Sequence, residues 1–181
     1  KDVAELAYLN NFDSLRVQKS IQELMATNML SQASKSKGAS IKTTYELSEL
    51  ARSYLGKHHT PTQKFQKSIR DKRNKLNALF EQQMSRRNGN IYSLKNVKFR
   101  DKADRIIVKM LMDSFGFIGS GKHDQAFPIL EEAHRLAPDY FEVARFMAYF
   151  HQKSGNLNDA RKQYELAIVL SPDTPQLHFW F

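Results

Sequence analysis

The sequence of 181 residues contains no cysteine, only seven glycines and only five prolines. The absence of cysteine excludes disulfides, thiolate metal sites and cysteine nucleophiles together. No apolar run approaches the roughly 18 residues that cross a bilayer, so we expect no membrane partner and a cytoplasmic location. With 41% hydrophobic residues the chain can still build a core. Because it begins at Lys1 without methionine, we expect it to be a piece of a longer protein.

The net charge of +9 is concentrated in the middle of the chain. Residues 57–109 hold 15 basic and 4 acidic side chains, whereas residues 1–56 are nearly neutral and residues 110–181 carry a net charge of −3. A basic excess of this kind is typical of contact with nucleic acid or an acidic partner, so the middle segment is the place to test for either.

The C-terminal part contains a repeat with a period of 34 residues. Five positions recur in register: Gly121 as Gly155, Ala126 as Ala160, Leu130 as Tyr164, Ala133 as Ala167, and Pro138 as Pro172. Each unit predicts two helices joined at a glycine turn and closed by a proline that cannot continue the second helix. These residues resemble the tetratricopeptide repeat over residues 107–174, and residues 175–181 match the start of a third unit.

This resemblance implies a concave groove lined by the first helix of each unit. In the first unit the groove positions are apolar, namely Val108, Leu111, Phe115 and Ile118, and we expect them to pack against neighbouring protein. In the second unit they are Glu142, Arg145, Tyr149, Gln152 and Lys153. Their mixture of charge, amide and aromatic ring predicts a site for a protein or peptide ligand. The alternative is that both sets are solvated or packed faces without a ligand.

Residues 116–123 nearly match the phosphate-binding loop pattern, but His123 stands where a hydroxyl residue is needed. The pattern also requires a preceding strand, whereas residues 106–115 have helical apolar spacing. We therefore expect no nucleotide site here and interpret Gly121 as the turn between two helices.

Residues 2–57 predict a helix over 2–9, a second helix that Ser14 caps and that ends near Met29, and an exposed hairpin tip over 32–40. A strand over 41–47 and a helix over 48–55 follow. This order is that of a partial winged helix, which lacks its first helix and keeps a small β-hairpin.

The stretches Gln22-Glu23-Leu24 and Met29-Leu30, with residues 45–55, resemble the winged-helix segment of STAND signalling ATPases (NACHT and NB-ARC-like regulators). In that family the segment follows a nucleotide-binding domain and precedes a repeat array. The resemblance implies that the repeats sense a ligand and that the winged helix relays this to an upstream nucleotide-binding domain, in defence or transcriptional signalling. A histidine that often contacts nucleotide in that family is replaced here by Ser48, which leaves one hydroxyl to donate a hydrogen bond.

The alternative for this region is a DNA-binding winged helix with Arg16, Gln18, Lys19 and Gln22 at base edges and Lys35, Lys37 and Lys42 on the wing. Because the region is nearly neutral, these residues are explained equally well as exposed polar side chains of a packed domain.

A long basic helix is predicted from Pro61 to about Arg87, with an apolar stripe that includes Phe65 and Phe80. The rest of its surface is cationic, with Lys67, Arg70, Arg73 and Lys75 as the candidate nucleic-acid contacts. The competing hypothesis is a connector helix with a solvated face. Residues 88–104 form a linker with an apolar group (Ile91, Tyr92, Leu94, Val97 and Phe99), and we expect part of it to pack or to form a short helix.

None of the six histidines forms a close pair with metal-ligand spacing, and no catalytic spacing is present, so we expect no metal, no cofactor and no enzyme activity. The predicted fold is mainly α: a winged-helix-like segment over residues 1–57, a basic helical connector and linker over 58–104, and a tetratricopeptide-type α-solenoid over 105–181. The predicted function is a non-catalytic regulatory or interaction role, and the alternative is a nucleic-acid-binding regulator.

Overall fold

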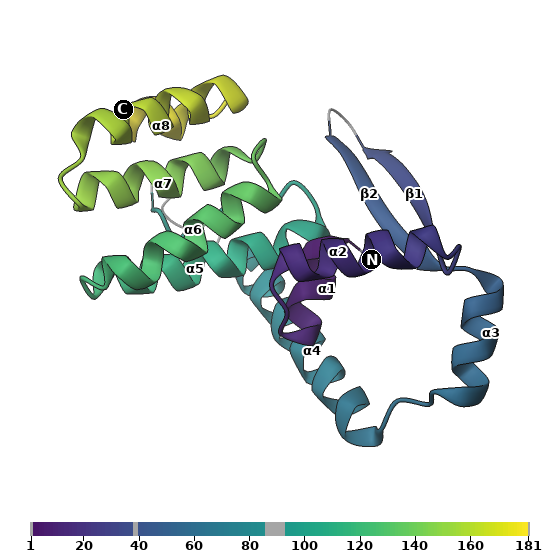
Figure 1. Cartoon of the computed structure of the whole chain (residues 1–181). Coiled ribbons are helices and arrows are strands. Elements are labelled where there is room, and N and C mark those ends of the chain that lie inside the picture. Colours follow the sequence, from purple (N-terminus) through teal and green to yellow (C-terminus); the bar gives the residue numbers. More distant parts are fainter. Residues whose placement is uncertain (1, 38–39, 86–92, 181) are drawn as a thin grey trace. The chain divides into compact units, whose positions relative to one another are not determined.

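The computed structural model describes residues 2–37, 40–85 and 93–180 (Figure 1). The chain divides into two compact units, unit 1 (Lys1–Lys75) and unit 2 (Leu76–Phe181). The fold is mainly α, as the sequence predicts, with one small antiparallel hairpin among the described residues.

Unit 1 begins with two helices and a hairpin. Its elements are α1 (Val3–Asn10), α2 (Ser14–Ala26), β1 (Leu30–Lys37), β2 (Ser40–Leu47), α3 (Glu49–His58) and the first half of α4 (Gln63–Ser85). A small apolar cluster of Ala7, Val17 and Ile21, joined by Leu30 and Tyr45, holds α1, α2 and the hairpin together.

Carboxylate and hydroxyl caps define where the helices of unit 1 begin. The Asp2 side chain accepts a hydrogen bond from the Glu5 amide at 2.7 Å, and Ser48 accepts one from the Ala51 amide at 3.3 Å. The prediction that Ser14 caps the second helix is wrong. Asp13 is the cap and accepts from the Arg16 amide at 2.8 Å, whereas Ser14 is the first helical residue and is fully buried. A carboxylate is an equally good N-cap, and it also favours the positive end of the helix.

The hairpin is longer than the sequence pattern predicts. Residues 32–37, expected to be part of an exposed tip, belong to β1 and pair with β2 in a register that runs from Leu30↔Leu47 to Lys37↔Ser40. Serine and lysine are weak strand formers, so the pairing with β2 outweighs their local preference. The tip itself falls at residues 38–39, outside the described residues.

Unit 2 is a stack of paired helices (Figure 1). After the short 3-10 helix η2 (Lys102–Asp104) come α5 (Arg105–Gly119), α6 (His123–Leu136), α7 (Phe141–Lys153), α8 (Leu157–Leu170) and α9 (Pro175–Trp180). α5 packs on α6, and α7 packs on α8. The two pairs meet where α7 contacts α5 and α6, and α9 packs on α8.

The 34-residue period places equivalent residues at equivalent positions in this stack. Ala126, Ala133, Ala160 and Ala167 are at most 4% exposed, as expected of small residues where two helices meet. Gly121 and Gly155 have φ of +71° and +80°, which is the left-handed region that a tight turn requires and that glycine adopts without strain. Gly116 and Gly119 belong to the last turn of α5 and His123 begins α6, so residues 116–123 connect two helices and do not form a phosphate loop.

Among the described residues, no helix has the length and apolar character needed to span a bilayer.

Candidate functional site

The predicted peptide-binding residues share one side of α7, the first helix of the second repeat. Glu142, Arg145, Tyr149 and Gln152 follow one another at spacings of three and four residues, which aligns their side chains along the helix. The structure divides them into a covered end, Glu142 and Arg145, and an open end, Tyr149, Gln152 and Lys153.

The covered end is a buried ion pair. Glu142 and Arg145 are 1% and 4% exposed, and the Arg145 Nε lies 2.6 Å from the Glu142 Oε2. A buried pair is tolerated only when its remaining donors and acceptors are also satisfied. The partners that complete this pair come from the segment that precedes η2.

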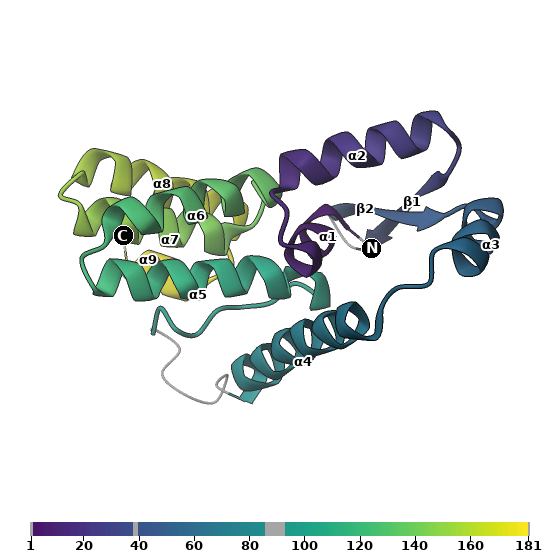
Figure 2. The same cartoon turned by 60° about the horizontal axis from the view of Figure 1, so that its bottom comes forward.

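Residues 93–100, here called the groove segment, supply these partners through their main chain. The Lys98 amide donates to the second oxygen of Glu142 at 2.7 Å, and an Arg145 guanidinium nitrogen donates to the Leu94 carbonyl at 3.4 Å. The Tyr140 hydroxyl, at the N-cap of α7, donates to the Lys98 carbonyl. Figure 2 shows the groove segment running along α5.

Apolar side chains fix the same segment. Leu94 and Val97 are 7% and 1% exposed, and Val97 belongs to the core cluster of unit 2 together with Val108 and Leu111 of α5. The apolar positions of the first repeat therefore pack against neighbouring protein, as expected. Phe99 lies edge-on to Phe80 of α4, with ring centroids 4.9 Å apart.

Ion pairs of Arg100 and its contact with the Tyr140 ring hold the end of the groove segment in place. Arg100 forms ion pairs with Asp104 at 3.1 Å and with Asp139 at 2.9 Å, and its guanidinium lies 4.4 Å from the centre of the Tyr140 ring. Burial lowers the pKa of Arg100, but the bonds and charges of Asp104 and Asp139 outweigh this and leave the pKa raised. Burial first, and the charges of Glu142 and Asp104 next, raise the pKa of Tyr140 well above its ordinary value, so its hydroxyl stays a donor at neutral pH.

A pocket of about 250 Å³ remains beside the groove segment. The Lys98 Nζ lies at its edge, 3.4 Å from the Thr174 hydroxyl and 3.5 Å from the Gln176 amide oxygen. Its lining comes from the segment, α7 and the start of α9: Asn96, Lys98, Phe141, Glu142, Arg145, Thr174, Gln176 and Leu177.

The open end of α7 presents an aromatic pair with cations. Tyr149 stacks on Phe115 of α5 with centroids 5.6 Å apart, and both rings are half-buried. The Lys153 Nζ lies 5.5 Å from the Tyr149 ring, and the Lys95 Nζ lies 6.0 Å from the Phe115 ring. Gln152 and Lys153 are exposed, so this end can offer stacking, apolar and cationic contacts to a ligand.

The predicted nucleic-acid residues lie on the part of α4 that belongs to unit 1. Lys67, Arg70, Arg73 and Lys75 are exposed, and Arg73 forms a 3.9 Å ion pair with Glu5. Lys72, between them, has a structural role, because its ammonium donates to the Leu9 carbonyl at 2.7 Å and to the Asn11 side chain at 2.8 Å. A cation at this position satisfies carbonyls at the C-terminus of α1 and opposes the negative end of that helix.

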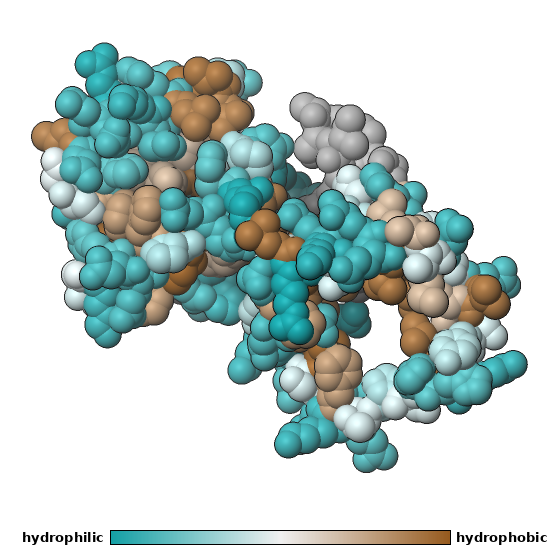
Figure 3. Space-filling model, in the orientation of Figure 1, coloured by the Kyte–Doolittle hydropathy of each residue, from teal (hydrophilic) through white to brown (hydrophobic). Residues whose placement is uncertain are grey.

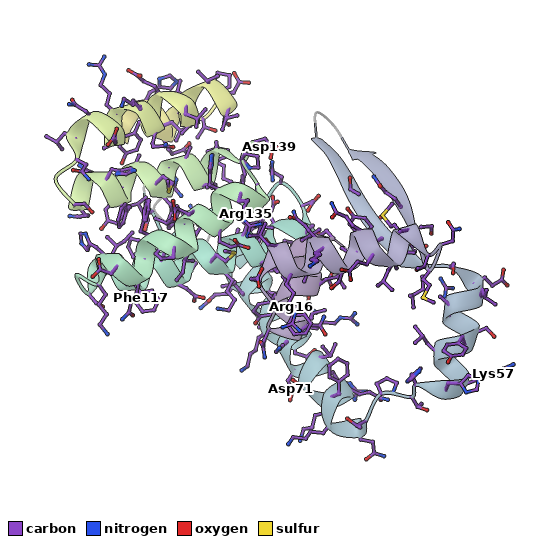
Figure 4. The ribbon with its side chains drawn as sticks, viewed as in Figure 1. Arg16, Lys57, Asp71, Phe117, Arg135 and Asp139 are labelled. Atoms are coloured by element: carbon purple, nitrogen blue, oxygen red, sulfur yellow. The ribbon has the colours of Figure 1, made fainter. Side chains whose placement is uncertain are left out.

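The other nucleic-acid candidates lie on α2 and the hairpin. Arg16 and Lys19 are exposed on α2, and Arg16, labelled in Figure 4, lies 4.1 Å from the centre of the Phe12 ring. Lys35 and Lys37 are in β1, but their side chains fall outside the described residues.

Among the described residues, no group of three or more histidine, aspartate and glutamate side chains is placed to hold a metal ion. The His123 Nδ1 lies 2.8 Å from the Ser154 hydroxyl and links the start of α6 to the turn after α7, which is a packing role.

The prediction that part of the 88–104 linker packs or forms a short helix is confirmed, because Leu94 and Val97 are buried and η2 lies in it. Sequence reasoning missed Tyr140 and Asp139, and it did not predict that the linker covers α7. The apolar residues Leu94 and Val97 indicated that the linker packs, but they did not indicate which surface it covers. Asp139, labelled in Figure 4 and located in the turn between α6 and α7, gave no signal because its partner Arg100 is 39 residues away.

The family model of the tetratricopeptide repeat matches residues 117–178. No curated protein and no solved structure matches the chain. Together with the paired helices and the 34-residue period, the match identifies a region of tetratricopeptide type. Such regions act in protein–protein interaction and are typically not catalytic.

Proposed function

We propose that the tetratricopeptide region binds a peptide or a segment of a partner protein on the groove side of α7. The observation that carries this proposal is that Tyr140, Glu142 and Arg145 hold the main chain of a non-helical segment. Hydrogen bonds to the main chain of an extended peptide give affinity whatever its sequence, and pockets for its side chains give specificity.

The open end of the groove gives the partner its point of contact. Tyr149 and Phe115 offer a rigid aromatic surface, and Lys153 adds a cation above it. Aromatic side chains of this kind contribute most of the binding free energy in many interfaces. A ligand with an acidic or aromatic side chain fits this end.

Selection of a displayed random-peptide library against the intact chain tests this function. We expect enriched peptides whose affinity falls by about tenfold or more in the double variant Tyr149→Ala, Lys153→Glu. The matched control is Lys162→Glu on α8, an exposed lysine whose side chain is 73% accessible. Absence of enriched peptides, or peptides that bind the double variant as well as the original chain, would contradict the proposal.

A finer proposal concerns unit 1 and the parent protein. We propose that residues 1–57 act as the winged-helix segment of a cytoplasmic STAND-type regulator and relay ligand binding to an upstream nucleotide-binding domain, in defence or transcriptional signalling. The order helix, helix, hairpin, helix in α1 to α3 supports it. Ser48 accepts a hydrogen bond from the Ala51 amide and keeps its own proton for a further acceptor such as a phosphate.

This relay requires the nucleotide chemistry to lie outside the chain. We expect no ATP hydrolysis and no ATP binding by the chain alone, measured by phosphate release and by calorimetry. Turnover, or tight binding of ATP, would contradict the relay.

The second candidate is nucleic-acid binding by unit 1, favoured by the exposed cations of α4. Lys67, Arg70 and Lys75 are exposed over little more than two turns, a density that suits phosphate contact. Lys35 and Lys37 on β1 and Arg73 on α4 would add to it.

Fluorescence anisotropy with a DNA duplex at increasing salt tests this candidate. The expected result is binding that weakens steeply with salt and collapses when all four α4 residues, Lys67, Arg70, Arg73 and Lys75, become glutamate. The control carries the same charge change in unit 2, at Lys122, Lys153, Arg161 and Lys162. No binding at low salt, or equal effects of the two variants, would remove nucleic acid as a partner.

A further inference from the structure

We infer that the groove segment, residues 93–100, is a built-in ligand of the tetratricopeptide groove, and that the groove accepts from a partner a basic, extended peptide of the same pattern. The inference rests on the proposed function and names both the class of peptide and the way the site is regulated. Four observations carry it.

The first observation is the way the segment is held. After a turn at residues 94–95 the chain from 96 to 99 is neither helix nor strand. Its hydrogen bonds to α7 run between side chains of the helix and main-chain groups of the segment: Tyr140 to the Lys98 carbonyl, Glu142 to the Lys98 amide, and Arg145 to the Leu94 carbonyl. Bonds of this kind do not depend on the segment's own sequence, so another extended chain can make them.

The second observation is an apolar pattern that gives specificity. Leu94 and Val97, three residues apart, are almost fully buried within unit 2. Charged side chains at these two positions would not gain the free energy that comes from burying apolar surface, so a competing peptide needs apolar side chains at the same spacing.

The third observation is charge complementarity. The segment carries three basic residues, Lys95, Lys98 and Arg100, and no acidic one, whereas residues 110–181 carry a net charge of −3. Arg100 meets Asp139 of the repeat region at 2.9 Å, and the Lys98 ammonium lies against the Thr174 hydroxyl and the Gln176 amide oxygen. The carboxylates of Asp104 and Asp139 therefore favour a partner peptide with a cation at the position of Arg100.

The fourth observation is that the segment does not fill the whole groove. The 250 Å³ pocket between the segment, α7 and α9 lies beside Lys98 and Asn96, so the segment leaves part of the groove free. A peptide with a larger side chain at the position of Asn96 has room to bind there.

The covalent connection makes the segment a strong competitor. Residues 93–100 are joined through η2 to α5, which sets their effective concentration at about the millimolar level. A partner peptide of ordinary affinity therefore binds weakly to the unaltered chain, and weakening the segment raises the apparent affinity of the partner.

The test uses a fluorescent synthetic peptide with the sequence of residues 93–100 and the full chain in two variants. Val97→Asp removes the apolar anchor of the segment. The double variant Lys98→Glu, Arg100→Glu reverses charge at two exposed residues and creates no cavity. We expect both variants to bind the peptide about tenfold or more tightly than the original chain. A peptide with aspartate in place of both Leu94 and Val97 serves as the control and should not bind.

Each other result has a defined meaning. Folded variants that bind the peptide no better than the original chain would overturn the inference. If only Val97→Asp unfolds, the affinity of the double variant for the peptide tests the inference. Unfolding of both variants would overturn the inference as well, since the segment would then be part of the core. Dimers of the original chain that exchange the segment would overturn the assignment to a separate partner. If library peptides bind the open end in the original chain while the segment peptide never binds the variants, the proposed function stands and this inference fails.

Discussion

In unit 2 the large side chains Tyr140, Phe146 and Leu130 have no exposed surface. Both units expose some large apolar side chains, such as Leu157 of unit 2 and Leu50 of unit 1, and Figure 3 shows apolar surface over α3. Among the described residues of unit 1, however, even the most buried apolar side chains, Leu9 and Ile21, are 5% exposed. Of the residues in α3, all of which the structure describes, only Ala51 is buried. Unit 2 is therefore stabilised mainly by side-chain burial, whereas in unit 1 caps and bonds to the main chain carry a larger share.

The same contrast holds for charge. In unit 2 a carboxylate and a guanidinium are buried together under the groove segment, whereas the Arg73–Glu5 pair of unit 1 is long and partly exposed. A charge removed from a buried pair leaves its partner unsatisfied in a dry environment, and one removed from an exposed pair is replaced by water. The variants below separate these two situations.

The largest effect is expected for Arg145→Leu, which leaves the Glu142 carboxylate buried without a counter-charge. The free energy of unfolding of unit 2 should fall by about 3–5 kcal/mol. Urea unfolding followed by circular dichroism measures this change.

Two controls accompany this variant. Adding Glu142→Gln to Arg145→Leu removes the unpaired charge and keeps an acceptor for the Lys98 amide, so part of the stability should return. Arg73→Leu in unit 1 should cost at most about 1 kcal/mol. An equal loss from Arg145→Leu and Arg73→Leu would contradict the contrast between buried and exposed charge.

The second prediction compares two leucines. Leu130 has no exposed surface and packs in the core of unit 2, so Leu130→Ala should cost about 2–5 kcal/mol through lost burial and the cavity left behind. Leu50, which is 83% exposed, should tolerate the same change within about 0.5 kcal/mol. Urea unfolding followed by circular dichroism measures both changes in the free energy of unfolding. Comparable losses for the two variants would show that the Leu50 side chain is covered in solution.

The third prediction concerns pH. Burial raises the pKa of Tyr140 above its ordinary value of 10.0, so the folded chain keeps a proton that the unfolded chain releases above that pH. The free energy of unfolding contributed by Tyr140 is therefore fully present below about pH 10 and falls as the pH rises further. Tyr140→Phe lacks this titration, so its free energy of unfolding should fall less steeply with pH than that of the original chain. The difference between the two slopes should be at most about 1.4 kcal/mol for each pH unit.

Urea unfolding at a series of pH values between about 9 and 11 measures that slope, with Tyr54→Phe in unit 1 as the exposed control. Parallel pH dependence of the original chain and Tyr140→Phe would show that the phenol is accessible to solvent. It would also argue against its bond to the Lys98 carbonyl.

The two units also differ in how much of their structure could be predicted from the sequence. The repeat could be predicted because its positions, such as Ala126 with Ala160 and Gly121 with Gly155, recur for a local geometric reason. The groove segment could not, because Lys98 and Glu142 are 44 residues apart and their bond uses a main-chain amide that leaves no trace in the sequence. In unit 1 the helices were predicted, but the hairpin was placed too short because pairing outweighed the polar composition of residues 32–37.

The smallest effect distinguishes two adjacent residues at the start of α2, where the sequence pointed to Ser14 as the cap and the structure has Asp13. Asp13→Ala removes the acceptor of the Arg16 amide and should cost about 1 kcal/mol. The Ser14 hydroxyl is buried without a hydrogen-bond partner among the described residues, so Ser14→Ala removes an unsatisfied group and should be neutral or slightly stabilising. Urea unfolding of unit 1 followed by circular dichroism measures both. A larger loss for Ser14→Ala than for Asp13→Ala would reverse the assignment of the cap, and would return the start of α2 to the interpretation that its sequence first favoured.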